Sequence, residues 1–280
     1  MTITAHPVPR PAKSTRLPSV ISVGVSRGWF EIRAFLRQRE SVVFTLLFPI
    51  MLLVLFGGVF NRNITPGVMF VQYFVAGMIA AGILGSCFQS LAIQIPIERD
   101  SGTLKRLIGT PMPKSSYFLG KVILVLAVTA LSDALLLAVG MAFFDISLPA
   151  SPDRWIAFAW ISGLGITACT LVGIAFSSVI PNGRSAPAIV SPVTLLLQFT
   201  SGVFFVYDDL PPWLQQIAAI LPLKWMCQGI RYVFLPDSFA ASEPAGAWEL
   251  DRIAMVLSAW AIAGLALCLV TFRWHGRRER

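Results

Sequence analysis

Six long runs of apolar residues constrain this chain more than any other feature. They occupy residues 41–60, 68–95, 117–144, 155–180, 186–206 and 253–272. Because about 20 residues of helix cross a bilayer, each run is long enough to span one. Charged residues make up only 13% of the 280 residues, well below the share in ordinary soluble domains. The sequence therefore predicts an all-α integral membrane protein with six transmembrane helices in one membrane domain, residues 41–272.

The distribution of basic residues predicts the orientation. Seventeen of the 22 Lys and Arg residues lie before residue 41, after residue 272, in segments 96–116 and 181–185, or at Lys121, which is expected to snorkel to the interface. Cytoplasmic segments of membrane proteins are enriched in Lys and Arg. We therefore expect both termini in the cytoplasm of a bacterial cell with the chain in its plasma membrane. The same rule explains the net charge of +8, so we expect no nucleic-acid partner.

The chain ends carry shorter predicted segments. Residues 1–19 are rich in proline and basic side chains, which predicts a disordered cytoplasmic tail, and residues 273–280 form a second basic tail. Residues 20–40 have helical periodicity, and their apolar and charged side chains fall on opposite faces. The apolar positions are Ile21, Val25, Trp29, Ile32, Phe35 and Leu36, and the charged positions are Arg27, Glu31, Arg33 and Arg37. This pattern favours an interfacial amphipathic helix over a surface helix of a soluble domain.

The stretch between the fifth and sixth runs is too long and too apolar for a simple loop. Within residues 207–236, two short apolar stripes are bounded by proline residues. Each stripe is too short to span a bilayer. We therefore expect short re-entrant helices in the outer leaflet before the last span. A small extracellular cap is the alternative.

A charged segment after the second run carries the most specific pattern. Thr103 is placed to cap a short helix, and Leu104, Leu107 and Ile108 then share one face, flanked by basic residues. Proline residues end the helix, so we expect it within residues 98–110. A short helix with an apolar ridge can fill a groove on another protein. The residues alone leave a second interpretation open, namely a charged loop that satisfies the positive-inside rule.

The same segment resembles the signature of the ABC type 2 permease family, in particular its daunorubicin-resistance-like drug-export branch. The matching residues are Glu98-Arg99-x-x-Gly102-Thr103-Leu104-x-x-Leu107-x-x-Thr110-Pro111. The resemblance implies an N-terminal interfacial helix, six spans, a cytoplasmic coupling helix and re-entrant helices before the last span. It also implies the residues that couple to the ATPase, which are Glu98, Arg99, Gly102, Thr103, Leu104, Leu107 and Ile108.

The resemblance further implies the partners and the function. The chain would pair with a second permease subunit, as a homodimer or heterodimer, and with two cytoplasmic ABC ATPase subunits that bind ATP and Mg²⁺. The expected function is ATP-driven export of an amphiphilic drug-like or lipid-like substrate. Export of a lipid-linked glycan or lipid is an alternative, and a secondary transporter or a membrane scaffold is an alternative from another class. A secondary transporter would need several ionisable groups within the membrane.

The sequence itself offers no catalytic or cofactor site. The phosphate-binding pattern G-x-x-x-x-G-K-[S/T] is absent, because Gly120-Lys121 is followed by Val122. The four cysteines and two histidines are scattered, which disfavours a metal site. We therefore expect a transport subunit that is not an enzyme and binds no cofactor, with membrane lipids around it.

Asp133 is the one acidic residue inside the six apolar runs. A carboxylate within a span is costly unless it faces protein or water. Asp133 is therefore a candidate contact on the substrate path, suited to a cation. The alternative is a packing partner of a Ser or Thr side chain.

Overall fold

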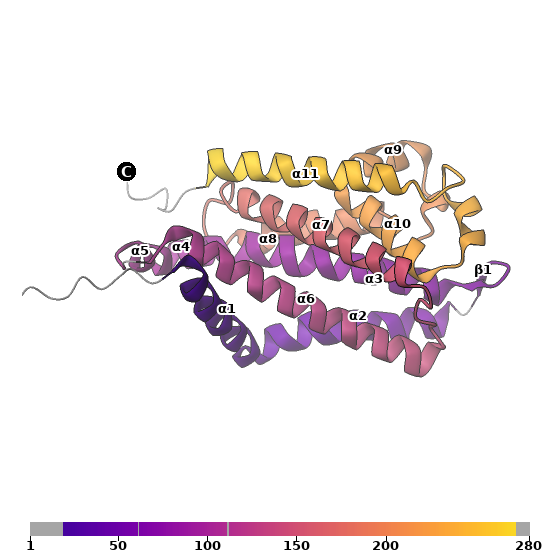
Figure 1. Ribbon diagram of the computed structural model, residues 1–280, viewed down its shortest axis with the longest axis horizontal. Helices are drawn as coiled ribbons and strands as arrows, with labels where there is room; N and C mark the ends of the chain where they lie inside the picture. The colour runs from indigo at the N-terminus through magenta and orange to yellow at the C-terminus, as the bar shows by residue number, and fades with distance from the viewer. Residues whose placement is uncertain (1–18, 61, 111, 273–280) are drawn as a thin grey trace, which may run out of the picture.

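The computed structural model describes residues 19–60, 62–110 and 112–272 as a bundle of helices along one long axis (Figure 1). The α-helices are α1 (Val20–Arg37), α2 (Arg39–Val59), α3 (Phe70–Leu84), α4 (Ser90–Asp100), α5 (Thr103–Ile108), α6 (Lys114–Phe144), α7 (Pro152–Phe176), α8 (Ala186–Thr200), α9 (Pro212–Ile220), α10 (Pro222–Phe234) and α11 (Leu250–Thr271). A π-helical turn, η1 (Gly85–Gln89), joins α3 to α4, and η2 (Tyr207–Asp209) and η3 (Asp237–Ser242) are 3₁₀ turns. Strands β1 (Asn63–Thr65) and β2 (Val68–Met69) form an antiparallel hairpin. The predicted tails lie outside the described residues, apart from Ser19, which caps α1.

Five helices in the described part of the chain are long and apolar enough to cross a membrane. They are α2, the continuous α3–η1–α4 segment, α6, α7 and α11. The all-α membrane class is thereby confirmed. The predicted fifth span is shorter than expected, because α8 contains 15 residues and therefore measures about 22 Å at the usual helical rise. Pro187 lies in its first turn and not in its interior, whereas Pro192 is inside it.

Contacts at the two ends of α8 place it along the bundle despite its length. The Gly183 amide, just before α8, donates to Asp100 Oδ2 at 2.6 Å, at the end of α4. The Tyr207 amide, after α8, donates to the Tyr73 hydroxyl at 3.0 Å, near the start of α3. The segment between these contacts therefore runs the same length as the α3–η1–α4 segment, in the opposite direction.

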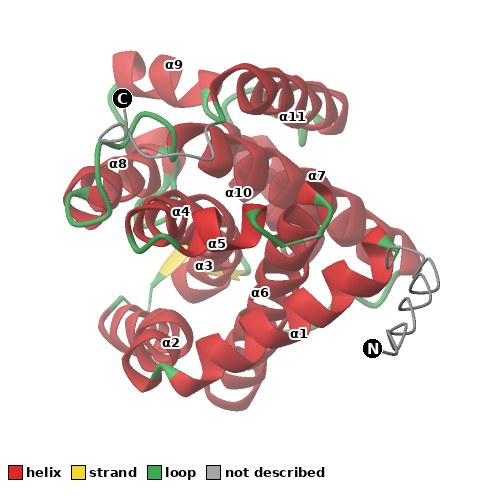
Figure 2. Cartoon of the chain, turned by 90° about the vertical axis from the view of Figure 1, so that its left-hand side faces the viewer, coloured by secondary structure: helices red, strands yellow, loops and turns green. Residues whose placement is uncertain are grey.

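The α3–η1–α4 segment forms the centre of the bundle (Figure 2). Within its most apolar window 78% of the residues are buried, against 17% for α2 and for α11. The outer helices therefore present apolar side chains such as Phe44 and Leu269 to their surroundings. In a membrane protein such faces meet lipid or another subunit.

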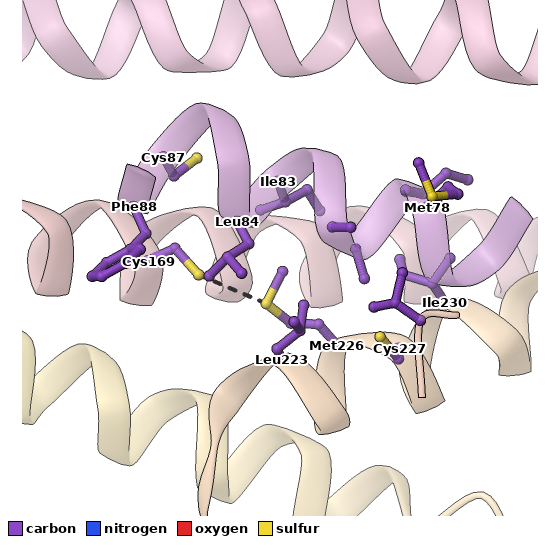
Figure 3. Close-up of a cluster of buried hydrophobic side chains, with 14 of the residues drawn as sticks. Met78, Ile83, Leu84, Cys87, Phe88, Cys169, Leu223, Met226, Cys227 and Ile230 are labelled. Atoms are coloured by element: carbon purple, nitrogen blue, oxygen red, sulfur yellow. Dashed lines mark hydrogen bonds between the residues drawn. The ribbon is translucent and has the colours of Figure 1, made fainter. Parts of the chain in front are cut away.

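The predicted re-entrant region folds into the core. Figure 3 shows Leu223, Met226 and Ile230 of α10 pointing toward α3 and α7. Met226 Sδ lies 3.8 Å from Cys169 Sγ of α7. Gly165 of α7 permits this approach, because a β-carbon there would lie 3.0 Å from Met226 Cε. Helix α10 is therefore wedged among the long helices, whereas α9 keeps Trp213 and Ile217 exposed.

Candidate functional site

A cavity of about 870 Å³ lies on one side of the bundle. Helix α2 packs on α3 and α6, whereas α8 packs on η1 and α4, so α2 and α8 form opposite walls with the central segment between them (Figure 2). Phe44 and Leu195 line the cavity and are 71% and 51% exposed, so the cavity is open toward the exterior of the bundle. A cavity of this size accommodates a drug-sized molecule.

The lining of this cavity combines apolar and uncharged polar side chains. The apolar residues include Phe35, Phe44, Phe48, Leu52, Met78, Leu195 and Phe204. The polar residues are Gln38, Ser41, Thr45, Ser86, Gln89, Ser90, Gln94, Ser132, Ser191, Thr194 and Gln198. Among the lining residues that the structure describes, Glu40 alone is charged. The cavity therefore suits an amphiphile.

The π-helical turn η1 sits at the back of the cavity. Gly85, Ser86 and Gln89 face the cavity, whereas Cys87 and Phe88 face the core. Helix α7 presses on the turn from behind, because a β-carbon on Gly173 would lie 2.8 Å from the Phe88 carbonyl oxygen. Such π-helical turns are frequent at functional sites. Sequence periodicity did not reveal this turn, because it lies inside a continuous apolar run.

The predicted coupling helix is shorter than expected. Helix α4 continues to Asp100, so Glu98 and Arg99 end the second long segment, and α5 spans only Thr103–Ile108. Gly102, not Thr103, occupies the N-cap position, with a φ of 73° that favours glycine.

The predicted apolar ridge of α5 faces inward in part, which corrects the expectation of an exposed ridge. Leu104 is fully buried in the subunit's own core, and Leu107 packs against that core. Lys105 and Arg106 of α5 are exposed. An apolar stripe indicates that a helix packs on something but does not say whether the partner is its own bundle.

A buried ionic cluster joins three elements at the α5 end of the bundle. Lys121 of α6 is fully buried and does not snorkel, because its ammonium group binds Glu98 of α4 and lies 3.1 Å from Glu31 Oε2 of α1. The Tyr117 hydroxyl donates to Glu98 Oε2 at 2.7 Å, and Arg27 pairs with Glu31 at 2.7 Å. Two cations thus balance two carboxylates, as burial of charge requires. Glu98 therefore acts within the subunit as a joint between helices.

Helix α1 packs on α6 through glycine. Gly24 and Gly28 face α6, and a β-carbon on Gly28 would lie 2.7 Å from Ile123 Cβ. Gly120 of α6 is equally close to α1, since its β-carbon would lie 2.7 Å from Arg27 Cγ. This small-residue contact leaves the predicted apolar face exposed, including Ile21, where it can meet a membrane surface. Hydrophobic periodicity alone does not identify the glycine face.

The end of α4 is also tied to the connection between α7 and α8. Arg99 donates to the Ser177 carbonyl oxygen at 3.0 Å, and Asp100 accepts from the Gly183 amide at 2.6 Å. Arg99 therefore contacts backbone of its own subunit. Together with the ionic cluster, these bonds join the end of α4, directly before α5, to α1, to α6 and to the connection between α7 and α8.

Asp133 lies beside the cavity and not in its lining. It is 8% exposed, and the position of a β-carbon on Gly82 lies 3.6 Å from its carboxylate. Gly82 and Ser132 line the cavity, but Asp133 is not among the lining residues that the structure describes. The carboxylate therefore stands behind this wall.

A second buried ionic cluster, missed by sequence reasoning, lies at the opposite end of the bundle. Arg231 of α10 is fully buried, pairs with Glu243 at 2.7 Å and donates to the Tyr73 hydroxyl at 3.1 Å. Lys224 stacks on the Trp225 ring at 3.6 Å. The α10 stripe named from sequence contained only apolar residues, so the basic residues on its other face were left unassigned. Arg231 fastens α10 to α3 through the Tyr73 hydroxyl.

The described residues contain no group of three His, Cys, Asp or Glu side chains placed to hold a metal ion. Gly120 and Lys121, the one Gly-Lys pair in the sequence, are both engaged in helix packing or ion pairing.

Comparison with known proteins finds a family match that contains all the described lining residues of the cavity. The family model for the ABC-2 type transporter matches residues 27–235. "Putative transport permease YvfS" of Bacillus subtilis is 26% identical over 225 residues, which cover 79% of this chain and 82% of that protein. The like-named ycf38 protein of Porphyra purpurea is 25% identical over 202 residues, covering 71% of this chain and 69% of that protein.

A third relative matches a shorter stretch. "Probable multidrug ABC transporter permease YbhR" of Escherichia coli is 24% identical over 147 residues, which cover 52% of this chain and 39% of that protein. The family match contains α5, both cavity walls and helix α10. On this evidence the chain belongs to the ABC-2 type transporter family.

Proposed function

We propose that this chain is the permease subunit of an ATP-driven exporter that moves an amphiphilic drug-like or lipid-like cargo out of the cell. Membership of the ABC-2 type transporter family implies a membrane transport subunit that works with ABC ATPase subunits. One observation carries the rest of the proposal: the open cavity is bordered by helices that are bonded, directly or through α1, to the segment around α5.

These bonds supply a route for coupling. A push on α5 would move Glu98 and Arg99 at the end of α4. Arg99 would carry the movement to α7 through Ser177, and Glu98 would carry it to α6 and α1 through Lys121. A cavity whose walls shift together can open to alternate sides of a membrane, as conformational transport cycles require.

The exposed face of α5 is the proposed docking surface for the ATPase. Lys105 and Arg106 are exposed there, while Leu104 is committed to the permease core. We assign contact with the ATPase to the basic face, and assign Gly102, Thr103 and Leu107 to shaping the segment that presents it. The side chain of Ile108 lies outside the described part of the structure, and its role in coupling stays a prediction.

The membrane arrangement follows from the crossings of the bundle. Helix α8 serves as the sixth crossing, since it runs between Gly183 and Tyr207 at opposite ends of the bundle. Six crossings put the start of α1 and the end of α11 on one side, which the charge distribution assigns to the cytoplasm. Two permease subunits and two ATPase subunits would form the complete exporter in a bacterial plasma membrane.

Transport with the cognate ATPase tests this proposal. The permease would be reconstituted in inside-out vesicles with the ATPase encoded beside it, and uptake of NBD-labelled amphiphiles would be followed. Uptake that requires ATP and disappears when the P-loop lysine of the ATPase is replaced supports an exporter. Uptake that follows an ion gradient and ignores ATP would establish a secondary transporter instead.

Labelling of single cysteines tests the orientation. Asn63→Cys should react with an impermeant maleimide added outside intact cells, and Ser101→Cys should react only after the cells are opened. The reverse pattern would contradict the assigned topology.

A further inference from the structure

We infer that the cavity selects cargo whose head group is uncharged and rich in hydrogen-bonding groups, such as the hydroxyls of a sugar, carried on an apolar body. This inference rests on the proposed export function and narrows its substrate class. It starts from four polar side chains that line the cavity. They are Ser86, Gln89, Ser132 and Gln198.

None of these four side chains has a hydrogen-bond partner among the described residues. Ser86 and Ser132 are nevertheless buried, at 5% and 4% exposure. Buried polar groups are nearly always hydrogen-bonded in folded proteins, because an unmet donor or acceptor is costly. Because these four side chains line the cavity, a polar group of a bound molecule can replace water as their hydrogen-bond partner there.

The four side chains come from three walls. Ser86 and Gln89 lie on the π-helical turn, Ser132 on α6 and Gln198 on α8. By contrast, Gln94 is already engaged, since it donates to Ser90 at 3.1 Å and accepts from Lys121 at 3.4 Å. The unmet groups therefore surround the part of the cavity beyond the Lys121 cluster, away from α5.

Charge in the lining argues against an ionic head group. Glu40, at the start of α2, is the one charged lining residue that the structure describes. Lys121 and Glu98 neutralise each other, and Asp133 stands behind the wall. Away from Glu40, a cation that left water would find no carboxylate among the described lining residues to replace its hydration. Amides and hydroxyls can replace the hydration of a neutral polyol by donating and accepting in equal measure.

The rest of the lining fits an apolar body. Phe44, Phe48, Leu195 and Phe204 line the cavity, and Phe44 and Leu195 lie where it opens to the exterior of the bundle. An alkyl chain or a fused ring system can lie along these residues while the head group reaches the π-helical turn. Hydroxyl-rich drugs and glycolipids both combine a polar, uncharged head group with an apolar body. The head group and not the body therefore defines the proposed class of cargo.

Photolabelling with two matched probes tests the inference. Dodecyl β-D-glucoside and dodecyltrimethylammonium, each with a diazirine at the end of the same alkyl chain, would be added to the full-length permease with its ATPase in nanodiscs. We expect the glucoside probe to label peptides of α2 and α8, with competition by unlabelled glucoside. The loss of two or more hydrogen bonds predicts labelling by the ammonium probe that is weaker by about tenfold.

Variants make the test specific to the head-group contacts. Gln198→Leu should raise the half-saturating glucoside concentration by about fivefold, the effect of one lost hydrogen bond. Ser162→Ala is the control, because Ser162 has a hydroxyl without a partner but is not among the described lining residues of the cavity. Gln89→Glu places a carboxylate at the turn and should increase labelling by the ammonium probe, a gain that misfolding cannot produce.

Equal labelling by both probes, or a preference for the ammonium probe in the wild type, would overturn the inference. Labelling is measured without ATP, so it is independent of export. If the glucoside probe binds as expected but is not transported with ATP, the proposed function fails while the head-group selectivity stands. If the chain exports cargo with ATP but prefers the ammonium probe, the head-group selectivity fails while the proposed function stands.

Discussion

Loss of Lys121 should destabilise the permease more than loss of any exposed lysine. Lys121→Met preserves the length of the side chain but leaves Glu98 with only the Tyr117 hydroxyl, while Glu31 keeps its pair with Arg27. Removing one partner of a buried ion pair costs about 3–5 kcal/mol. Because the Glu98 side chain is 18% exposed, we expect the lower end, about 3 kcal/mol.

Thermal unfolding in detergent measures this cost. At about 2–4 °C per kcal/mol for a chain of this size, the midpoint should fall by roughly 6–12 °C. Adding Glu98→Gln to Lys121→Met should recover a large part of the loss, since the amide can still accept from Tyr117. Lys114→Met, at an exposed position of the same helix, serves as the control. A midpoint for Lys121→Met that matches the control would refute the buried ionic joint.

Three further predictions concern coupling, helix packing and cargo selectivity. Leu104→Ala should destabilise the permease itself by about 2–5 kcal/mol. Arg106→Glu should leave the unfolding midpoint unchanged and reduce co-purification of the ATPase. The reverse pattern would show that Leu104 belongs to an exposed apolar ridge that binds the ATPase. Gly28→Ala should lower the unfolding midpoint because α1 meets α6 there, while Gly163→Ala, with nothing within 4 Å of its β-carbon position, should not lower it. Asp133→Asn should change export of cationic and neutral amphiphiles by the same factor, and a selective loss of cations would place its carboxylate on the cargo path.

The apolar runs made the class of fold predictable, because a bilayer dictates the length and composition of whatever crosses it. The ends of helices were harder to place. Helix α4 passes through Pro96 and continues to Asp100, since proline is tolerated in membrane helices whose freed backbone groups find other partners. The coupling segment was correspondingly placed too early, at residue 98.

The candidate site was less predictable, because it depends on contacts between distant residues. Lys121 is 90 residues from Glu31 and 23 from Glu98, so its pairing leaves no local signal and it resembled a snorkelling lysine. The described lining residues of the cavity come mostly from α1, α2, α3, α4, α6 and α8 and from η1, and its polar positions are spread through apolar runs. Asp133 stood out because it is charged, yet uncharged side chains such as Gln89 line the cavity.

The central claim is that ATP hydrolysis by a partner changes access to the cavity between α2 and α8. Leu195→Cys places a reactive thiol on the cavity wall. The native chain is the control, because Cys87, Cys169 and Cys227 are buried and any labelling of the half-buried Cys268 is measured there. Labelling by an impermeant maleimide would be measured from each side of vesicles that hold the permease and its ATPase. We predict that trapping with ATP and vanadate lowers the labelling rate from the cytoplasmic side and raises it from the outer side. Labelling that is unchanged from both sides, with the ATPase bound and hydrolysing ATP, would contradict the account.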